Sequence, residues 1–386
     1  MFKILTMNSI SPVYKKILSA DEYIVSPDVE NPDAILVRSA DMHSYELPAS
    51  VKCIARAGAG VNNIPSEAFA EKGVVVFNTP GANANAVKEL AIAALLLASR
   101  DIAGGIAWCQ SLKGEADVPK LVEKGKKAFV GPEIMGKTLG VIGLGEIGAL
   151  VANSADALGM KVLGHDPYIS VKHAWMLSRS VGHAKTQDEL LAASDYVTVH
   201  VPLLDSTRGM INDEFLAKMK PGAALLNLSR GELADNDAVK RALESGHLRT
   251  YVTDFPSEDL LGVKGVVVTP HLGASTPESE DNCVVMACQQ IDAYLKSGTI
   301  RNSVNYPACE LSMPDDRRIA VLHANVPNMI GQITSAIGRH NVNIDNMSNI
   351  SKGKFAYTVL HPDNEVPVKA IAALAEVEGI FGARLL

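Results

Sequence analysis

Three polar residues downstream of a glycine-rich stretch are candidates for acid–base chemistry. They are Arg230 in the segment Leu-Ser-Arg-Gly, Glu258 in Pro-Ser-Glu-Asp and His271 in Thr-Pro-His-Leu. The planar guanidinium of arginine matches a carboxylate, and histidine exchanges a proton near neutral pH. A glutamate beside that histidine would favour the imidazolium and fix the ring tautomer. The three residue types suit hydride transfer on a 2-hydroxy or 2-keto acid, provided that a nicotinamide lies nearby.

The glycine-rich stretch itself, residues 143–148, has the spacing of a dinucleotide-binding loop. It follows the apolar run Leu-Gly-Val-Ile and precedes a helix-compatible segment. Gly143 permits a tight turn, Gly145 lets a pyrophosphate approach the backbone, and Gly148 permits close packing of helix on strand. Asp166 ends the next expected strand about 20 residues further on, where a carboxylate binds ribose hydroxyls. Since no arginine closely follows Asp166, the sequence favours NAD over NADP.

The composition restricts the class of protein. The chain has 386 residues, of which 47% are hydrophobic and 20% charged, so we expect several folded domains rather than disorder. The net charge of −7 argues against a nucleic-acid partner. The five cysteines contain no CxxC pair, so neither a disulfide framework nor a metal site is predicted, and a reducing cytoplasm is expected. No signal peptide or membrane span is expected, because the longest apolar run, residues 90–98, is too short to cross a bilayer.

The order of the expected elements predicts an α/β protein with two doubly wound parallel sheets and a third, smaller domain. Apolar, β-rich runs alternate with helical stretches over residues 1–93 and again over 136–280, as is typical of parallel sheets buried on both faces. A long helical stretch is expected over 88–113, and a helix near 283–295 is expected to return the chain to the first sheet. From residue 317 the order strand, helix, two strands, helix, strand predicts a ferredoxin-like βαββαβ module.

Three domains follow from this order. Residues 1–93 with 285–310 should form a flavodoxin-like substrate-binding domain, and 94–284 a Rossmann domain for the dinucleotide. Residues 315–386 should form the βαββαβ module, joined by a linker at 313–316.

The motifs together resemble those of the D-isomer-specific 2-hydroxyacid dehydrogenases. Beside the glycine stretch, the resemblance rests on four segments and extends over nearly the whole chain: residues 136–140, 200–203, 227–231 and 269–271. In that family an Arg, a Glu and a His carry catalysis, and these correspond to Arg230, Glu258 and His271. The added C-terminal module resembles that of the members that oxidise 3-phospho-D-glycerate with NAD, the first step of L-serine biosynthesis.

The resemblance also implies the remaining ligand contacts. Those implied for the cofactor are Ala59, Gly143, Gly145, Glu146, Ile147, Gly148, Asp166, His200, Val201, Pro202, Leu228, Ser229, Arg230, Asp254, His271, Gly273 and Ala274. Those implied for the substrate are Arg38, Ser39, Arg56, Gly58, Asn83, Arg230 and His271. A phosphorylated acid carries a second anionic group, for which Arg38 and Arg56 would be the cations. The alternative interpretation is that both arginines only form ordinary surface ion pairs.

The loop before Glu258 departs from the family pattern. The family usually has Asp-Val-Phe-x-x-Glu-Pro, whereas residues 253–259 of this chain read Thr-Asp-Phe-Pro-Ser-Glu-Asp. One residue is missing and the proline after the glutamate is absent. In this register Asp254 corresponds to the residue that holds the nicotinamide amide and Glu258 to the catalytic glutamate. Asp259 is the only other carboxylate in register.

The C-terminal module resembles an ACT domain, a small regulatory fold that binds an amino acid between paired copies. Its implied ligand is L-serine, and the corresponding side chains are His323, Asn325 and Asn343. A purely dimerising module is the alternative. The family's Pro-Gly is Pro-Asn here, and Asn328 should adopt the positive φ that the turn requires. We therefore expect a homodimer or homotetramer.

Two other functions stay open at this point. One is a glycerate, glyoxylate or hydroxypyruvate reductase of the same family, which would depend little on Arg38 and Arg56. The other is a non-catalytic regulator that senses NAD or serine. The presence of both Arg230 and His271 argues against the regulator.

Overall fold

A computed structural model describes residues 1–310 and 317–386, and the linker expected at 313–316 lies outside them. The contacts divide the chain into two compact units, one of Met1–Ala82 with Glu280–Leu386 and one of Asn83–Ser279. The predicted boundaries at 93/94 and 284/285 fall inside helices α2 (Ala84–Ser99) and α10 (Pro277–Ser297), whereas the contacts divide near the start of each helix.

The first unit contains a five-stranded parallel sheet of order β2-β1-β3-β4-β5. Its strands are β1 (Phe2–Met7), β2 (Tyr23–Ser26), β3 (Ala34–Val37), β4 (Cys53–Arg56) and β5 (Val75–Phe77). β3 and β5 are wholly buried, which explains why their sequences are continuous apolar runs. Helix α10 packs on one face through Ala287, Ile291 and Tyr294, and α1 (Ser66–Ala70) packs on the other. The strand order confirms the flavodoxin-like topology.

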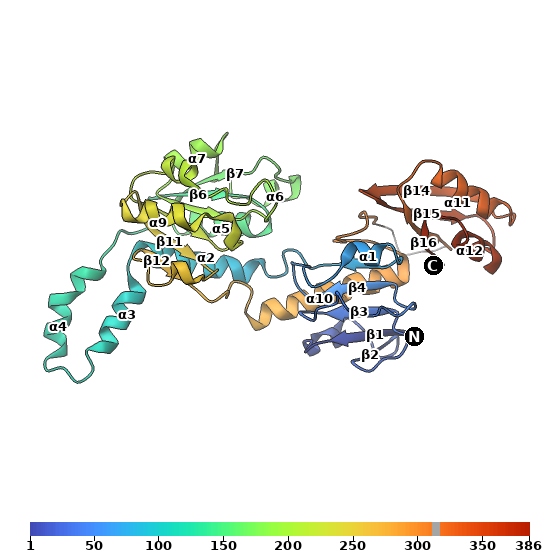
Figure 1. Cartoon of the computed structure of the whole chain (residues 1–386), viewed down its shortest axis with the longest axis horizontal. Helices are drawn as coiled ribbons and strands as arrows, with labels where there is room; N and C mark the ends of the chain where they lie inside the picture. Colours follow the sequence, from blue (N-terminus) through green and yellow to red (C-terminus); the bar gives the residue numbers. More distant parts are fainter. Residues whose placement is uncertain (311–316) are drawn as a thin grey trace. The chain divides into compact units, whose positions relative to one another are not determined.

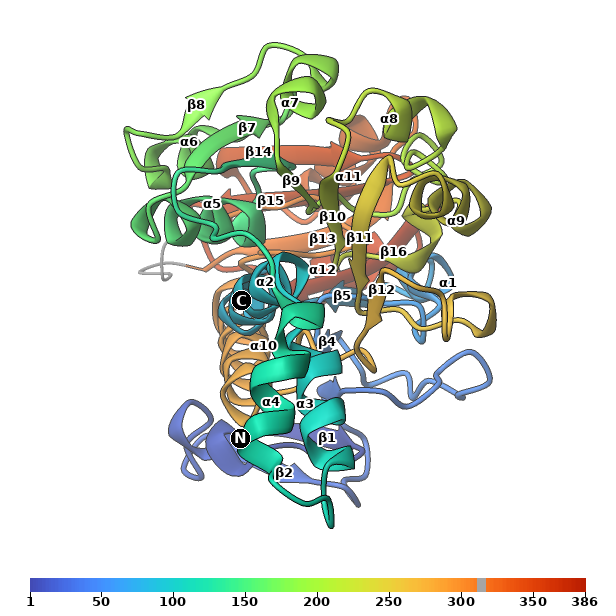
Figure 2. The same ribbon diagram turned by 90° about the vertical axis from the view of Figure 1, so that its left-hand side faces the viewer.

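The second unit contains a seven-stranded parallel sheet of order β12-β11-β10-β9-β6-β7-β8. Its strands are β6 (Thr138–Ile142), β7 (Lys161–His165), β8 (Gly182–His183), β9 (Tyr196–Val199), β10 (Ala223–Asn227), β11 (Leu248–Thr253) and β12 (Val266–Val268). The order reverses between β6 and β9, so ligands are expected at the carboxyl ends of these two strands. Figure 2 shows the strands β9 to β12 following one another across this sheet.

Helices cover both faces of the second sheet. One face carries α2 and α5 (Glu146–Ala157). The other carries α7 (Gln187–Ala193), α8 (Asp213–Ala217) and α9 (Asn236–Glu244). A short helix α6 (Val171–Met176) follows β7. This arrangement confirms the predicted doubly wound architecture.

The helical stretch predicted over 88–113 is helical in the structure but is divided into two helices. The chain forms α2 and then α3 (Ile102–Ser111), which are bent by 70° with respect to each other. Arg100 is extended, and the Asp101 carboxylate accepts a hydrogen bond from Gly104 N as the N-cap of α3. Helices α3 and α4 (Val118–Gly125) project from the rest of their unit (Figure 1). No single helix of the described residues meets the length and hydropathy needed to cross a membrane, although this bent pair meets them when taken together.

The C-terminal module belongs to the first unit and has the predicted βαββαβ order. Its elements are β13 (Ile319–Ala324), α11 (Met329–Gly338), β14 (Ile344–Lys352), β15 (Phe355–Pro362), α12 (Val368–Ala375) and β16 (Ile380–Leu385). They form an antiparallel sheet of order β14-β15-β13-β16. The two helices cover one face, whereas Ala320, Leu322 and Tyr357 on the other share a core with α10. The turn before α11 depends on Asn328, whose φ of 64° confirms the predicted left-handed conformation.

Candidate functional site

The loop after β6 has the geometry that a dinucleotide phosphate requires. Gly143 adopts a φ of 88°, and a Cβ there would lie 2.6 Å from the His200 carbonyl oxygen. A Cβ on Gly148 would collide with the carbonyl oxygen of Gly143, so helix and strand pack as closely as only glycine permits. Gly145 is the N-cap of α5, and the space beside its Cα is open. The N–H groups of the first turn of α5 are thus available to an anion.

Acidic residues next to this loop are already held in place. Asp166 follows β7, and its carboxylate accepts hydrogen bonds from Leu144 N at 2.9 Å and Tyr168 N at 2.8 Å. It therefore fixes the loop and keeps acceptor capacity for a ribose. Glu146 forms ion pairs with Lys172 at 2.6 Å and His173 at 3.2 Å, and the hydrogen bond from Lys172 lowers the pKa of its carboxyl group.

The segment after β9 lies beside the glycine loop, as the pairing of β6 with β9 dictates. His200 begins this segment, followed by Val201 and Pro202. Burial lowers the pKa of His200 to about 4. The Nε2 atom lies 2.9 Å from Thr198 Oγ1, whereas Nδ1 is buried without a hydrogen-bond partner among the described residues. His200 is thus a neutral residue beneath the loop rather than an acid–base group near neutral pH.

Asp254 anchors the loop that carries His271. Its side chain is only 1% exposed, and it accepts hydrogen bonds from Thr269 Oγ1 at 2.6 Å, Leu272 N at 2.8 Å and Gly273 N at 2.7 Å. Its backbone oxygen accepts a further bond from His271 N at 3.1 Å. Three donors still leave one acceptor site on a carboxylate for the predicted contact with the nicotinamide amide. Since Ala274 follows Gly273 directly, the anchor also positions the last predicted cofactor residue.

His271 lies exposed on this anchored loop in an unusual backbone conformation. Its φ is 56°, which is rare for a residue other than glycine or asparagine and costs about 1 kcal/mol or more. Its ring lies 4.9 Å from that of Phe255, measured between centroids, at an interplanar angle of 58°. The strained backbone thus directs the imidazole away from the strand and against an aromatic neighbour.

The structure does not contain the predicted hydrogen bond between His271 and Glu258. Glu258 begins the short turn η4 (Glu258–Leu260) and is exposed, and its side chain forms no hydrogen bond or ion pair with any described residue. The alternative carboxylate, Asp259, instead contacts Asn236 at 3.3 Å and Lys240 at 3.4 Å, so it is tied to α9. Of the two, Glu258 is therefore the one free to approach His271, and its catalytic role stays a prediction.

Arg230 lies at the carboxyl end of β10, after the buried Leu228. Ser229 Oγ donates to Val199 O at 2.8 Å, which ties this segment to β9. The exposed Arg230 side chain donates from Nη1 only to Ser229 O, at 2.6 Å. Its guanidinium thus has no carboxylate partner among the described residues and keeps most of its donors for a ligand.

The predicted substrate residues of the first unit gather after β3 and β4. Arg56 Nε donates to Arg38 O at 3.0 Å, and Arg56 Nη1 donates to Gly60 O. A Cβ at position 58 would lie 2.7 Å from Arg56 Nη1, so a larger residue there would displace the end of the Arg56 side chain. The neighbouring Ala59 oxygen accepts a bond from Asn78 Nδ2 at 2.6 Å, which leaves its N–H for other contacts.

The remaining substrate residues occupy turns. Ser39 N donates to Asn8 Oδ1 at 3.0 Å, and Asn83 is the N-cap of α2 without a side-chain capping bond. An unpredicted residue, Glu280 at the start of α10, forms an ion pair with Arg38. No local pattern could reveal that pair, because the two residues lie 242 positions apart.

The three predicted serine contacts do not meet within one chain. His323 is 2% exposed and lies 2.8 Å from Thr358 Oγ1, and burial lowers the pKa of its ring. Asn325 Nδ2 donates to Gly353 O and Asn343 Nδ2 to Asp363 Oδ2, at opposite ends of β15. At about 3.4 Å per residue, the 8 residues of β15 separate the two asparagines by more than one amino acid could bridge. A site that uses both requires a second copy of the chain.

No cluster of potential metal ligands occurs within residues 1–310 and 317–386.

The sequence of the second unit is similar to that of a known family. Residues 92–273 match the NAD-binding domain of the D-isomer specific 2-hydroxyacid dehydrogenases. This match supports NAD as the cofactor of the glycine loop described above.

Individual relatives agree with this assignment. The chain is 39% identical over 287 residues to a D-3-phosphoglycerate dehydrogenase of Mycobacterium leprae, a match that covers 72% of this chain and 52% of the relative. It is 36% identical over 341 residues to that of Archaeoglobus fulgidus, covering 85% of this chain and 61% of the relative. The chain thus spans about half to three fifths of the length of these relatives.

Among solved structures, the fold is similar to that of NAD+-bound 3-phosphoglycerate dehydrogenase from Entamoeba histolytica. The two have a TM-score of 0.61 and 27% sequence identity, and the match covers 79% of this chain and 98% of the other.

Proposed function

We propose that this chain is an NAD-dependent D-3-phosphoglycerate dehydrogenase, which oxidises 3-phospho-D-glycerate to 3-phosphohydroxypyruvate in L-serine biosynthesis. The observation that carries the proposal is the anchoring of the His271 loop by Asp254 in the same unit as the glycine loop. The relatives named above support the choice of substrate. The free cysteines accord with the reducing cytoplasm that we expect.

The proposed chemistry divides between three side chains. NAD, when bound, accepts the hydride from C2 of the hydroxy acid. His271 takes the hydroxyl proton in oxidation and returns it in reduction. Arg230 holds the carboxylate and the C2 oxygen with its planar fork of donors. Glu258, once turned toward the imidazole, stabilises the imidazolium.

The second anion of the substrate is assigned to the arginines of the first unit. Arg38 directly follows β3 and Arg56 ends the neighbouring strand β4, and the Arg56 side chain donates to the backbone carbonyl oxygen of Arg38. Arg38 is 44% exposed at its side chain, so its ion pair with Glu280 is accessible to competition by a phosphate. Ser39, which follows Arg38, and Asn83, at the start of the second unit, would add hydrogen bonds.

The phosphate assignment is tested by comparing substrates on one variant. Arg56→Ala should lower kcat/KM for 3-phosphohydroxypyruvate at least tenfold more than for hydroxypyruvate, because a charge-assisted contact contributes about 1.5–3 kcal/mol. Arg301→Ala is the matched control, since Arg301 is an exposed arginine of the same unit that pairs with Glu310. Equal losses on both substrates would reject the phosphate role.

Regulation by serine is a separate part of the proposal. His323 and Asn325 of one chain would act with Asn343 of a second copy, so the module would bind serine only in a dimer or tetramer. Isothermal titration with L-serine, run together with inhibition assays, tests this. If a dimer gives neither heat nor inhibition with L-serine, the C-terminal module would serve only in assembly and not in regulation.

A further inference from the structure

A cavity of about 350 Å³ lies in the first unit, where the C-terminal module packs on the parallel sheet. Its walls come from the residues preceding β3 and β4, from the last turns of α10, and from β13 and β16. No residue assigned above to the dinucleotide, the hydroxy acid or serine lines it. The cavity is therefore separate from every site considered so far.

The walls of this cavity are held rigidly. Tyr357 of β15 donates its hydroxyl to Gly298 O at 2.9 Å, just after α10. Arg384 of β16 donates to the last carbonyls of α10, Leu295 O at 3.4 Å and Tyr294 O. Gly73 has a φ of 72° and so little space that a Cβ would collide with the backbone of Phe381. The cavity is therefore built into a packed interface and does not depend on a loose loop.

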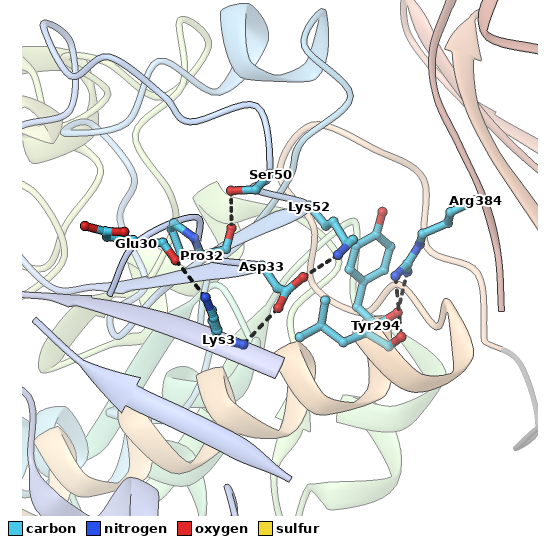
Figure 3. A network of polar contacts seen from close by, with 9 residues as sticks. Lys3, Glu30, Pro32, Asp33, Ser50, Lys52, Tyr294 and Arg384 are labelled. Atoms are coloured by element: carbon cyan, nitrogen blue, oxygen red, sulfur yellow. Dashed lines mark hydrogen bonds and ion pairs between the residues drawn. The ribbon is translucent and has the colours of Figure 1, made fainter. Parts of the chain in front are cut away.

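Positive charge exceeds negative charge around the cavity. Lys52 is already neutralised by Asp33, whose other oxygen accepts a hydrogen bond from Lys3 N at 2.8 Å (Figure 3). Arg384 and Lys72 have no carboxylate partner within residues 1–310 and 317–386. The Arg384 guanidinium lies over the Tyr294 ring at 4.2 Å from its centroid, and its Nε is buried without a hydrogen-bond partner. A partly buried guanidinium without a counter-ion favours an anion beside it.

Apolar surface lines the rest of the cavity. Leu322, Phe381 and the Tyr357 ring contribute to its walls, and the whole volume falls in the range of small-molecule sites. An inorganic ion would satisfy the cations and leave this surface in contact with water. A ligand that combines one anionic group with an apolar body would satisfy both.

We propose that this cavity binds a small organic anion, with a phosphate or carboxylate group against Arg384 and Lys72 and an apolar body against Leu322 and Phe381. Such a ligand contacts the C-terminal module and the sheet together, so it stabilises their docked arrangement by linkage. The strands β3 and β4, of 4 residues each, lead from the cavity residues Asp33 and Lys52 to Arg38, which directly follows β3, and to Arg56, which ends β4. Occupancy can therefore act on the substrate-binding arginines through two short, buried strands.

Hydrogen exchange on the full-length protein tests the proposal with phenylphosphonate as the probe. The probe should protect the backbone amides of residues 71–74 and 380–385, and inorganic phosphate should need at least tenfold higher concentration for the same protection. Lys72→Met should weaken this protection at least tenfold, and it leaves the packing intact because Lys72 is exposed. Arg384→Met is the second variant. The matched control is Lys218→Met, because Lys218 is a partly exposed, ion-paired lysine of the other unit.

The outcomes separate the proposal from its rivals. Protection that is lost in both cavity variants and retained in Lys218→Met supports it. Protection confined to residues 38–60 would mean that the probe binds only the proposed substrate loops, and the proposal would be wrong. Unchanged protection in Lys72→Met and Arg384→Met, or no protection at residues 380–385 in the wild type, would equally overturn it.

Discussion

Replacing Asp254 by asparagine should destabilise the second unit and release the loop that carries His271. The carboxylate is almost fully buried and accepts three hydrogen bonds, two on Oδ1 and one on Oδ2. An asparagine oxygen can still accept the two bonds from Thr269 and Leu272. Its amide nitrogen would then face the Gly273 N–H, so one bond is lost and two donors meet.

The expected loss in the free energy of unfolding follows from these three hydrogen bonds. Loss of the charge-assisted bond to Gly273 N leaves a buried donor unsatisfied, which costs about 1–3 kcal/mol. The two retained bonds lose their ionic character and weaken by about 0.5–1 kcal/mol each. We therefore expect a loss of about 3 kcal/mol in the free energy of unfolding of this unit.

Urea unfolding followed by tryptophan fluorescence measures this loss. Both tryptophans, Trp108 and Trp175, lie in the second unit, so they report on it specifically. Asp213→Asn is the matched control, because Asp213 is an exposed carboxylate of the same unit that pairs with Arg241, and this substitution should leave the unfolding midpoint close to that of the wild type. If Asp254→Asn unfolds within about 0.5 kcal/mol of the wild type, the anchoring role argued here is refuted.

Three further predictions concern the same unit. Gly145→Ala should leave stability unchanged but weaken NAD binding at least tenfold. Gly148→Ala should also destabilise the fold, because its Cβ would collide with the carbonyl oxygen of Gly143. Calorimetry with NAD and thermal unfolding distinguish the two variants. Between about pH 4 and pH 6.5, His200 is neutral in the folded protein and protonated in the unfolded one. The free energy of unfolding should therefore fall by about 1.4 kcal/mol for each pH unit as the pH drops through this range. His200→Gln should remove this pH dependence from acid-unfolding curves. His271→Asn keeps a residue that tolerates positive φ, so kcat should fall about 10²–10⁴-fold with little change in melting temperature, and a full loss of stability would contradict this.

The parallel sheets were predictable because buried strands have continuous apolar runs. Residues 34–37 and 223–227 are wholly buried in the structure, and they are apolar except for Asn227, whose side-chain amide donates to Arg230 O at 2.8 Å. The break in the long helix was missed, since it depends on the capping of α3 by Asp101, a local polar bond within an otherwise apolar stretch.

The sequence predicted which residues belong to the candidate site better than it predicted their hydrogen bonds and ion pairs. The glycine spacing indicated the turn at Gly143 because its conformation is a local property of the chain. The three bonds to Asp254 and the pair of Arg38 with Glu280 join elements far apart in the sequence, and only tertiary structure brings them together. The orientation of Glu258 belongs to the same class, because a short exposed turn does not determine where its side chain points.

The most direct test of the proposed D-3-phosphoglycerate dehydrogenase activity is the oxidation of NADH by 3-phosphohydroxypyruvate, followed by absorbance. We expect steady consumption of NADH, with kcat/KM at least tenfold higher than for hydroxypyruvate or glyoxylate. Faster turnover of the unphosphorylated acids would contradict it in favour of a reductase of the same family. NAD binding without any turnover would contradict it in favour of a non-catalytic sensor.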